Sequence, residues 1–183
     1  MPIRSLRSGL AISLLLGSLA GCVPNHPDAA FRRVPVPASL PPQDVVLEVS
    51  GPKTGTPIRL DLTTLCAFPA TRFTIRDPWD LQEHLFEGVL LLPLLQRLGL
   101  GAGAELIEVS AANGYRAASR IADLRRFGYL LAYQMDGELT ADRKALTKRG
   151  ALQTALDFDG RPKLSVDVYK HQLVWQVVRI EVK

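Results

Sequence analysis

Short segments that alternate apolar and polar side chains, each ended by a turn signal, constrain the fold of this chain more than any other feature. Residues 45–51 (VVLEVSG) and 58–62 (IRLDL) have the pattern of half-buried strands and are joined by a Gly/Pro-rich turn. Asn113-Gly114 is a strong hairpin signal between two more strands within 104–119. The same pattern predicts further strands at 71–75, 129–134, 151–158 and 172–182, and residues 86–89 are expected to form a strand and a turn.

Only a few short helices are expected among these strands. Thr63 or Thr64 is a candidate N-cap for the first helix, and residues 91–98 and 121–127 have the apolar spacing of two more. Strands and helices that do not alternate regularly indicate an α+β fold rather than a doubly wound parallel sheet. We therefore expect a single α+β domain over residues 44–183.

The N-terminus has the layout of an export signal. Two arginines precede an uncharged apolar stretch at 10–19, which is shorter than the roughly 20 residues of a membrane-spanning helix. This layout predicts a secretory signal peptide over residues 1–21. The sequence LAGC at 19–22 resembles the lipobox of bacterial lipoproteins, so the resemblance implies lipid attachment at Cys22. The alternative is an ordinary signal peptide that contains a cysteine by chance.

The segment that follows is rich in proline and has no periodic apolar spacing. Residues 22–43 are therefore expected to form an extended tether that holds the domain off the membrane. The signal predicts a protein of the bacterial cell envelope, lipid-anchored and facing the periplasm. Val23 is not the aspartate that retains some lipoproteins at the inner membrane, which favours the outer membrane.

The charge of the chain argues against a nucleic-acid partner. Residues 1–21 hold two arginines and no acids, so the remaining chain carries 20 Lys+Arg and 18 Asp+Glu. These charges are scattered rather than gathered in a basic stripe. The partners that we expect are the membrane, through the lipid anchor, a small-molecule or anionic ligand, and a second protein of the envelope.

Cysteine and histidine usage excludes several kinds of site. If Cys22 is acylated, Cys66 has no intramolecular partner, so we expect no disulfide and a Cys66 side chain buried as a small apolar group. The chain has three histidines, widely separated in sequence, and this spacing does not predict a zinc site. The sequence contains neither a nucleophile elbow nor a phosphate-binding loop.

Four segments, taken in order, resemble a known family. They are FEGVLLLPLLQRLGL (86–100), VSAANGYRAASRIADL (109–124), LLAYQMDGELT (130–140) and VWQVVRIEV (174–182). Together they resemble the oxidoreductase molybdopterin-binding domain, in particular small exported bacterial proteins built from that domain alone. The resemblance covers roughly residues 45–183 and implies the sulfite-oxidase-like fold and, for catalytic members, a molybdopterin cofactor.

The resemblance also shows a departure from the catalytic pattern. In catalytic members one cysteine thiolate binds the molybdenum, a few residues before a tryptophan, and a soft thiolate suits this metal. Here FTIRDPWD (73–80) matches that stretch, Ile75 occupies the ligand position, and Cys66 lies thirteen residues before Trp79. We therefore expect no catalytic residue, no metal ligand and no cofactor, and predict a non-catalytic binding, sensing or accessory module. The alternative is a molybdopterin-dependent oxidoreductase with atypical metal ligation.

The same stretch supplies the candidate ligand-binding residues. Pro78 fixes its own φ and favours extended geometry in the residue before it, so Trp79 is expected to be held rigidly, as a cleft wall or as a core side chain. An arginine fork matches an oxyanion, which makes Arg76 the expected partner of a small anion. The expected site consists of Arg76, Asp77, Trp79, His84, Tyr115 and His171.

Overall fold

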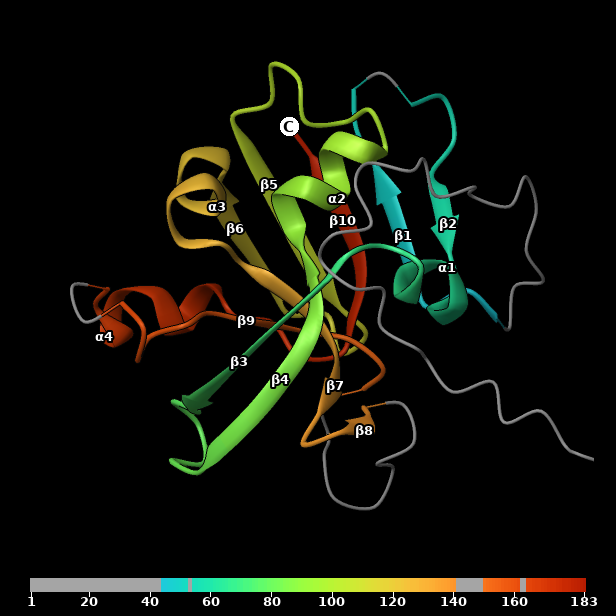
Figure 1. Cartoon of the computed structure of the whole chain (residues 1–183). Helices are drawn as coiled ribbons and strands as arrows, with labels where there is room; N and C mark the ends of the chain where they lie inside the picture. The colour runs from blue at the N-terminus through green and yellow to red at the C-terminus, as the bar shows by residue number, and fades with distance from the viewer. Residues whose placement is uncertain (1–43, 53, 141–149, 162–163) are drawn as a thin grey trace, which may run out of the picture.

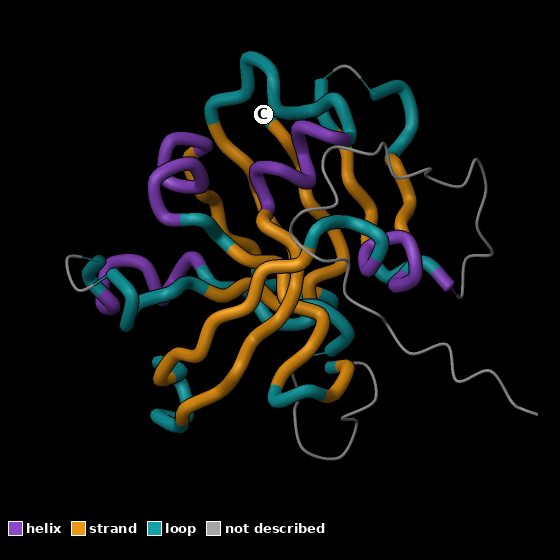
Figure 2. Tube along the Cα trace, viewed as in Figure 1, coloured by secondary structure: helices purple, strands orange, loops and turns teal. Residues whose placement is uncertain are grey.

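The computed structural model describes residues 44–52, 54–140, 150–161 and 164–183. The expected signal peptide, the lipid attachment at Cys22 and the tether at 22–43 lie outside these residues. Strands form the centre of the molecule and the helices lie toward its outside (Figure 2). Among the described residues, no helix has the length and apolar character needed to cross a membrane.

Five strands form the first sheet, in the order β2-β1-β10-β5-β6. β1 and β10 are parallel, and the other neighbours are antiparallel. The β5–β6 hairpin turns at Asn113-Gly114, as the sequence predicts, with Gly114 at a φ of 87°. The strands are β1 (Leu47–Ser50), β2 (Ile58–Leu60), β5 (Leu106–Ala111), β6 (Arg116–Arg120) and β10 (Val177–Val182).

The second sheet has the order β3-β4-β7-β8, with β9 pairing β7, and all of its neighbours are antiparallel. β3 and β4 form a long hairpin that extends away from the first sheet (Figure 1). The strand and turn expected at 86–89 are a continuous part of β4. A Cβ on Gly88 would meet the Leu131 carbonyl oxygen of β7 at 2.0 Å, so this position of the strand requires glycine. The strands are β3 (Ala70–Arg76), β4 (Glu83–Leu90), β7 (Leu130–Met135), β8 (Glu138–Leu139) and β9 (Gln153–Ala155).

The helices are short, and three of them are those that the sequence predicts. The N-cap of α1 is Asp61 and not a threonine: the Asp61 Oδ1 accepts a hydrogen bond from the Thr64 N–H at 2.7 Å. The expected strands at 151–158 and 172–182 are shorter than predicted, and two helical turns that the sequence did not predict lie between them. The helices are α1 (Leu62–Cys66), α2 (Leu91–Arg97), α3 (Ile121–Phe127), α4 (Val166–Tyr169) and the 3-10 helix η2 (Lys170–Gln172).

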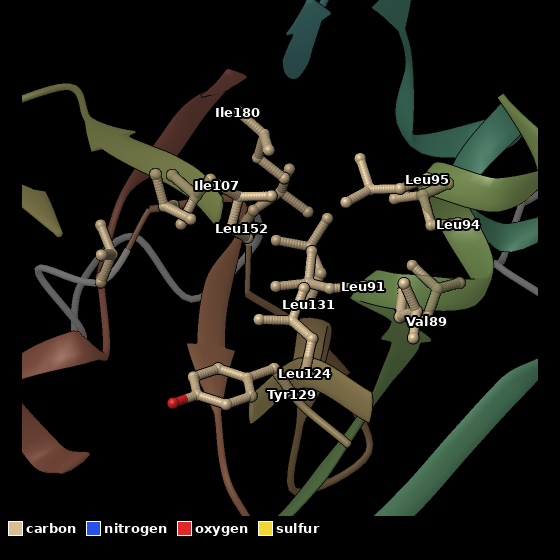
Figure 3. Packing of buried hydrophobic residues seen from close by; sticks show 14 of the residues in the cluster. Val89, Leu91, Leu94, Leu95, Ile107, Leu124, Tyr129, Leu131, Leu152 and Ile180 are labelled. Atoms are coloured by element: carbon tan, nitrogen blue, oxygen red, sulfur yellow. The ribbon is translucent and has the colours of Figure 1, made fainter. Parts of the chain in front are cut away.

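Buried apolar side chains form two clusters on the two sides of the second sheet. The larger cluster joins both sheets to α2 and α3, and leucines from α2, β7 and residue 152 point toward one another in it (Figure 3). The smaller cluster contains Ile75, Phe86, Leu130, Ala132, Met135 and Ala155. Because strand side chains alternate between faces, β7 supplies side chains to both clusters.

Cys66 differs from the prediction. It ends α1 and is buried, as expected, but it is disulfide-bonded, and no described cysteine is a free thiol. The expectation of no disulfide is therefore wrong for this structure. That expectation assigned the other cysteine sulfur to a lipid, and sequence spacing does not show which thiols the fold brings together.

Candidate functional site

A tight turn at residues 77–82 holds Trp79 at the far end of the β3–β4 hairpin. The buried Asp77 Oδ1 accepts hydrogen bonds from the Trp79 N–H at 2.8 Å and the Asp80 N–H at 3.4 Å. The backbone of Asp77 also bonds Gln82 and Leu81, at 2.8 and 2.9 Å. These bonds, together with Pro78, fix the direction in which Trp79 leaves the turn.

The two other candidate residues of this hairpin brace the turn. The Arg76 Nε–H donates to the Leu81 carbonyl oxygen at 3.0 Å. The His84 Nε2 lies 3.1 Å from the Asp80 Oδ2, and its Nδ1 lies 2.8 Å from the Asp136 Oδ2. His84 therefore joins the 77–82 turn to the turn between β7 and β8.

The β5–β6 hairpin and η2 supply the opposite side of the site. The Asn113 Oδ1 accepts a hydrogen bond from the Tyr115 N–H at 3.0 Å, and the Tyr115 hydroxyl donates to the His171 carbonyl oxygen at 2.6 Å. The Gln172 Oε1 accepts from the Ser119 hydroxyl at 3.1 Å and from the Tyr129 hydroxyl. These bonds hold η2 against β6.

The hydrogen bond from Tyr129 to Gln172 has a buried donor, because Tyr129 lies in the core. Burial is the main cause that raises the pKa of the Tyr129 phenol above its ordinary value. The hydroxyl therefore stays protonated and remains a donor to Gln172. Tyr133, also buried, has its pKa raised to about 12 by burial and secondarily by Glu87.

Between these two supports lies a pocket of about 290 Å³, which we call the Trp79 pocket. The rings of Trp79 and Trp175 meet edge to face, with centroids 5.7 Å apart and planes at 77°. The Trp79 and His171 rings are 6.5 Å apart at 75°. The described residues that line the pocket are Trp79, Asn113, Tyr115, His171, Leu173 and Trp175.

The structure thus brings together three of the six candidate residues, Trp79, Tyr115 and His171. The other three, Arg76, Asp77 and His84, lie outside the lining of this pocket and make the turn contacts given above. Ligand binding by any of the six stays a prediction.

Trp175 is the residue that the sequence did not assign to this site. It falls in the strand expected at 172–182, but it precedes β10, is half-buried and forms an isolated bridge to Gln153. Its only signal in the sequence is that it is the second of two tryptophans. Asn113, expected only as a turn residue, is both a turn residue and part of the lining.

The fold is the sulfite-oxidase-like α+β fold, with one mixed sheet, one antiparallel sheet and short helices. A solved structure with this likeness is the sulfane dehydrogenase SoxCD from Paracoccus pantotrophus, with a TM-score of 0.56 and 18% sequence identity. The match covers 79% of this chain and 39% of that chain, so this chain spans well under half of the length of the enzyme chain. No family model and no curated protein match the sequence.

Proposed function

We propose that this protein is a non-catalytic module of the bacterial envelope that binds a small ligand in the Trp79 pocket. The observation that carries this proposal is the contrast between the pocket and the neighbouring ligand position. Trp79 lines the pocket, while Ile75, in the position expected for the metal ligand, is 1% exposed and packs in the smaller apolar cluster. An aromatic pocket with few polar groups is the ordinary form of a small-molecule site.

The residues present do not fit the thiolate ligation of molybdenum. An isoleucine side chain has no donor atom, and the sulfur of Cys66 is part of a disulfide and not a thiolate. Among the described residues, no three His, Cys, Asp or Glu side chains group as a metal site. We therefore derive no redox step for this protein.

A second function follows from the fold. The likeness to a sulfane dehydrogenase favours an oxidoreductase that holds a molybdopterin cofactor with atypical metal ligation. Elemental analysis of the purified mature protein separates the two functions. The binding module contains molybdenum far below one atom per chain, and stoichiometric molybdenum would overturn it in favour of the oxidoreductase.

Lipid anchoring at Cys22 is part of the proposal, together with a periplasmic orientation, outer-membrane sorting and an envelope protein as a further partner. The chain has two cysteines, so a Cys22 sulfur that carries a lipid cannot also join a disulfide. Lipid attachment at Cys22 and an intramolecular disulfide at Cys66 therefore exclude each other. Multiple acyl chains stabilise anchoring because each buried methylene contributes about 0.8 kcal/mol.

Labelling with palmitate tests the anchor. We expect the protein to incorporate labelled palmitate and to fractionate with the membrane, and Cys22→Ala to do neither. A wild-type protein without palmitate would contradict the anchor while leaving the proposed pocket untouched. Sucrose-gradient fractionation then locates the anchored form in the outer or the inner membrane.

A further inference from the structure

The walls of the Trp79 pocket meet at steep angles. Trp79 stands at 77° to Trp175 and at 75° to His171, and we call these three rings the aromatic corner. Tyr115, whose hydroxyl is bonded to the His171 backbone, adds a fourth ring to the lining. These rings come from three parts of the chain: the 77–82 turn, the β5–β6 hairpin and the segment that runs from η2 to β10.

This shape selects among ligands. A flat aromatic ligand stacks best between parallel ring faces, and the Trp79 ring is parallel to neither Trp175 nor His171. Steeply angled walls instead surround a rounded group and contact it from several sides. The pocket therefore fits a compact, nearly spherical group better than a plate.

The charge of the lining residues also selects among classes of ligand. The face of an aromatic ring carries the negative part of its quadrupole and attracts cations. None of the described lining residues is a lysine, arginine, aspartate or glutamate. Two basic side chains close in sequence to the lining are engaged elsewhere: the Arg76 Nε–H donates to the Leu81 carbonyl, and the Lys170 Nζ lies 2.9 Å from the Asp167 Oδ1.

The Lys170 contact is an ion pair. Its hydrogen bond to Asp167 is the main cause that lowers the pKa of the Asp167 carboxyl below its ordinary value. The pair neutralises the lysine beside His171. Neither basic residue is thus placed to bind an anion in the pocket, which weakens the expectation of an oxyanion held by Arg76.

From this shape and charge we infer that the Trp79 pocket binds a quaternary ammonium group, such as the trimethylammonium head of a small molecule. The inference rests on the proposed ligand-binding function and names its ligand class. A trimethylammonium group is round, and its charge is spread over methyl groups that contact ring faces without losing hydrogen bonds. Aromatic cages recognise such groups through cation–π attraction.

Intrinsic tryptophan fluorescence can measure ligand binding in the Trp79 pocket, because both tryptophans of the chain, Trp79 and Trp175, line it. We would titrate the full mature protein with choline and follow tryptophan emission. The matched probe is the neutral analogue of choline in which a tert-butyl group replaces trimethylammonium, with the same shape and no charge. We expect choline to bind about tenfold more tightly than this analogue, in line with the usual strength of cation–π contacts.

Two variants test whether the preference for choline depends on the Trp79 ring. Trp79→Phe keeps a ring face, so it should retain most of the preference for choline over the neutral analogue. Trp79→Leu keeps an apolar side chain without a ring and should lose that preference. Trp175 remains as the fluorescent reporter in both, and far-UV circular dichroism confirms that both are folded.

The outcomes separate the inference from the proposed function. Equal or tighter binding of the neutral analogue overturns the inference, and so does a preference that persists in Trp79→Leu. Sulfate and indole, titrated in the same way, represent anionic and flat aromatic ligands. If only one of these binds, the inference fails and the binding module stands, whereas no response to any of the four probes contradicts both.

Discussion

Ile75 and Trp79 lie four residues apart and belong to different regions of the molecule. Ile75 is 1% exposed within the sheet, and Trp79 is 42% exposed at the tip of the hairpin. The first region is built like any protein core, with Phe86 and Met135 packed in the same cluster. The second is an aromatic side chain held outward by a hydrogen-bonded turn. The comparison teaches that four residues separate a buried apolar side chain, at the position where the sequence resemblance implies a metal ligand, from a wall of the Trp79 pocket.

The boundary between the two regions falls at Asp77-Pro78. Up to Arg76 the chain pairs with β4, and Ile75 lies opposite His84. Proline has no N–H to donate to a strand ladder, and Asp77 turns its carboxylate to the N–H groups that follow. The chain therefore leaves the sheet here, and the alternation of strand side chains stops.

The largest expected effect on stability is at Ile75, on the core side of the Asp77-Pro78 boundary. Ile75→Ala removes buried methyl and methylene groups and leaves a cavity, so we expect it to lower the free energy of unfolding by about 2–5 kcal/mol. Thr74→Ala, on the exposed face of the same strand, is the matched control and should change it by about 0.5 kcal/mol or less. Urea denaturation measures both. An Ile75→Ala variant as stable as the control would mean that Ile75 is not a core residue.

A smaller effect is expected at the boundary itself. Asp77→Ala removes the acceptor for the Trp79 and Asp80 N–H groups, and loss of such a cap costs about 0.5–2 kcal/mol. It should also free Trp79, seen as stronger quenching of tryptophan emission by acrylamide. Asp77→Asn keeps an oxygen acceptor and should stay close to the wild type. If both variants behave alike, the turn hydrogen bonds do not position Trp79.

Ile75→Cys is expected to have the smallest effect. It places a thiol in the ligand position, but the side chain faces the apolar cluster and the other cofactor contacts are not thereby supplied. Elemental analysis should find no gain of molybdenum relative to the wild type, with Thr74→Cys as the control for nonspecific metal binding. Stoichiometric metal in Ile75→Cys alone would show that only the thiolate is missing.

The fold was largely predictable from local patterns. Turn chemistry located the Asn113-Gly114 hairpin, and apolar spacing located α2 and α3. The α+β assignment followed from the irregular order of these elements. α4 was missed because its two valines, Val166 and Val168, are exposed and give no apolar helical stripe.

The site was less predictable, because it depends on which way side chains point. Arg76 and His84 are neighbours of Trp79 in sequence, yet both brace the turn. Trp175 contacts Trp79 although it lies far from it in sequence, and its position depends on pairing that no local pattern encodes. Cys66 likewise formed a disulfide that cysteine spacing did not reveal.

The free energy of unfolding of Trp79→Ala tests the central claim most directly, that the FTIRDPWD stretch ends in a pocket wall and not in a core anchor. Far-UV circular dichroism in urea measures it without depending on the tryptophan that is removed. Because Trp79 is 42% exposed, we predict a loss well below the roughly 3–5 kcal/mol that truncation of a core tryptophan costs. A loss within that range would contradict the account, because it would mean that Trp79 holds the fold together and that its ring is not free to bind a ligand.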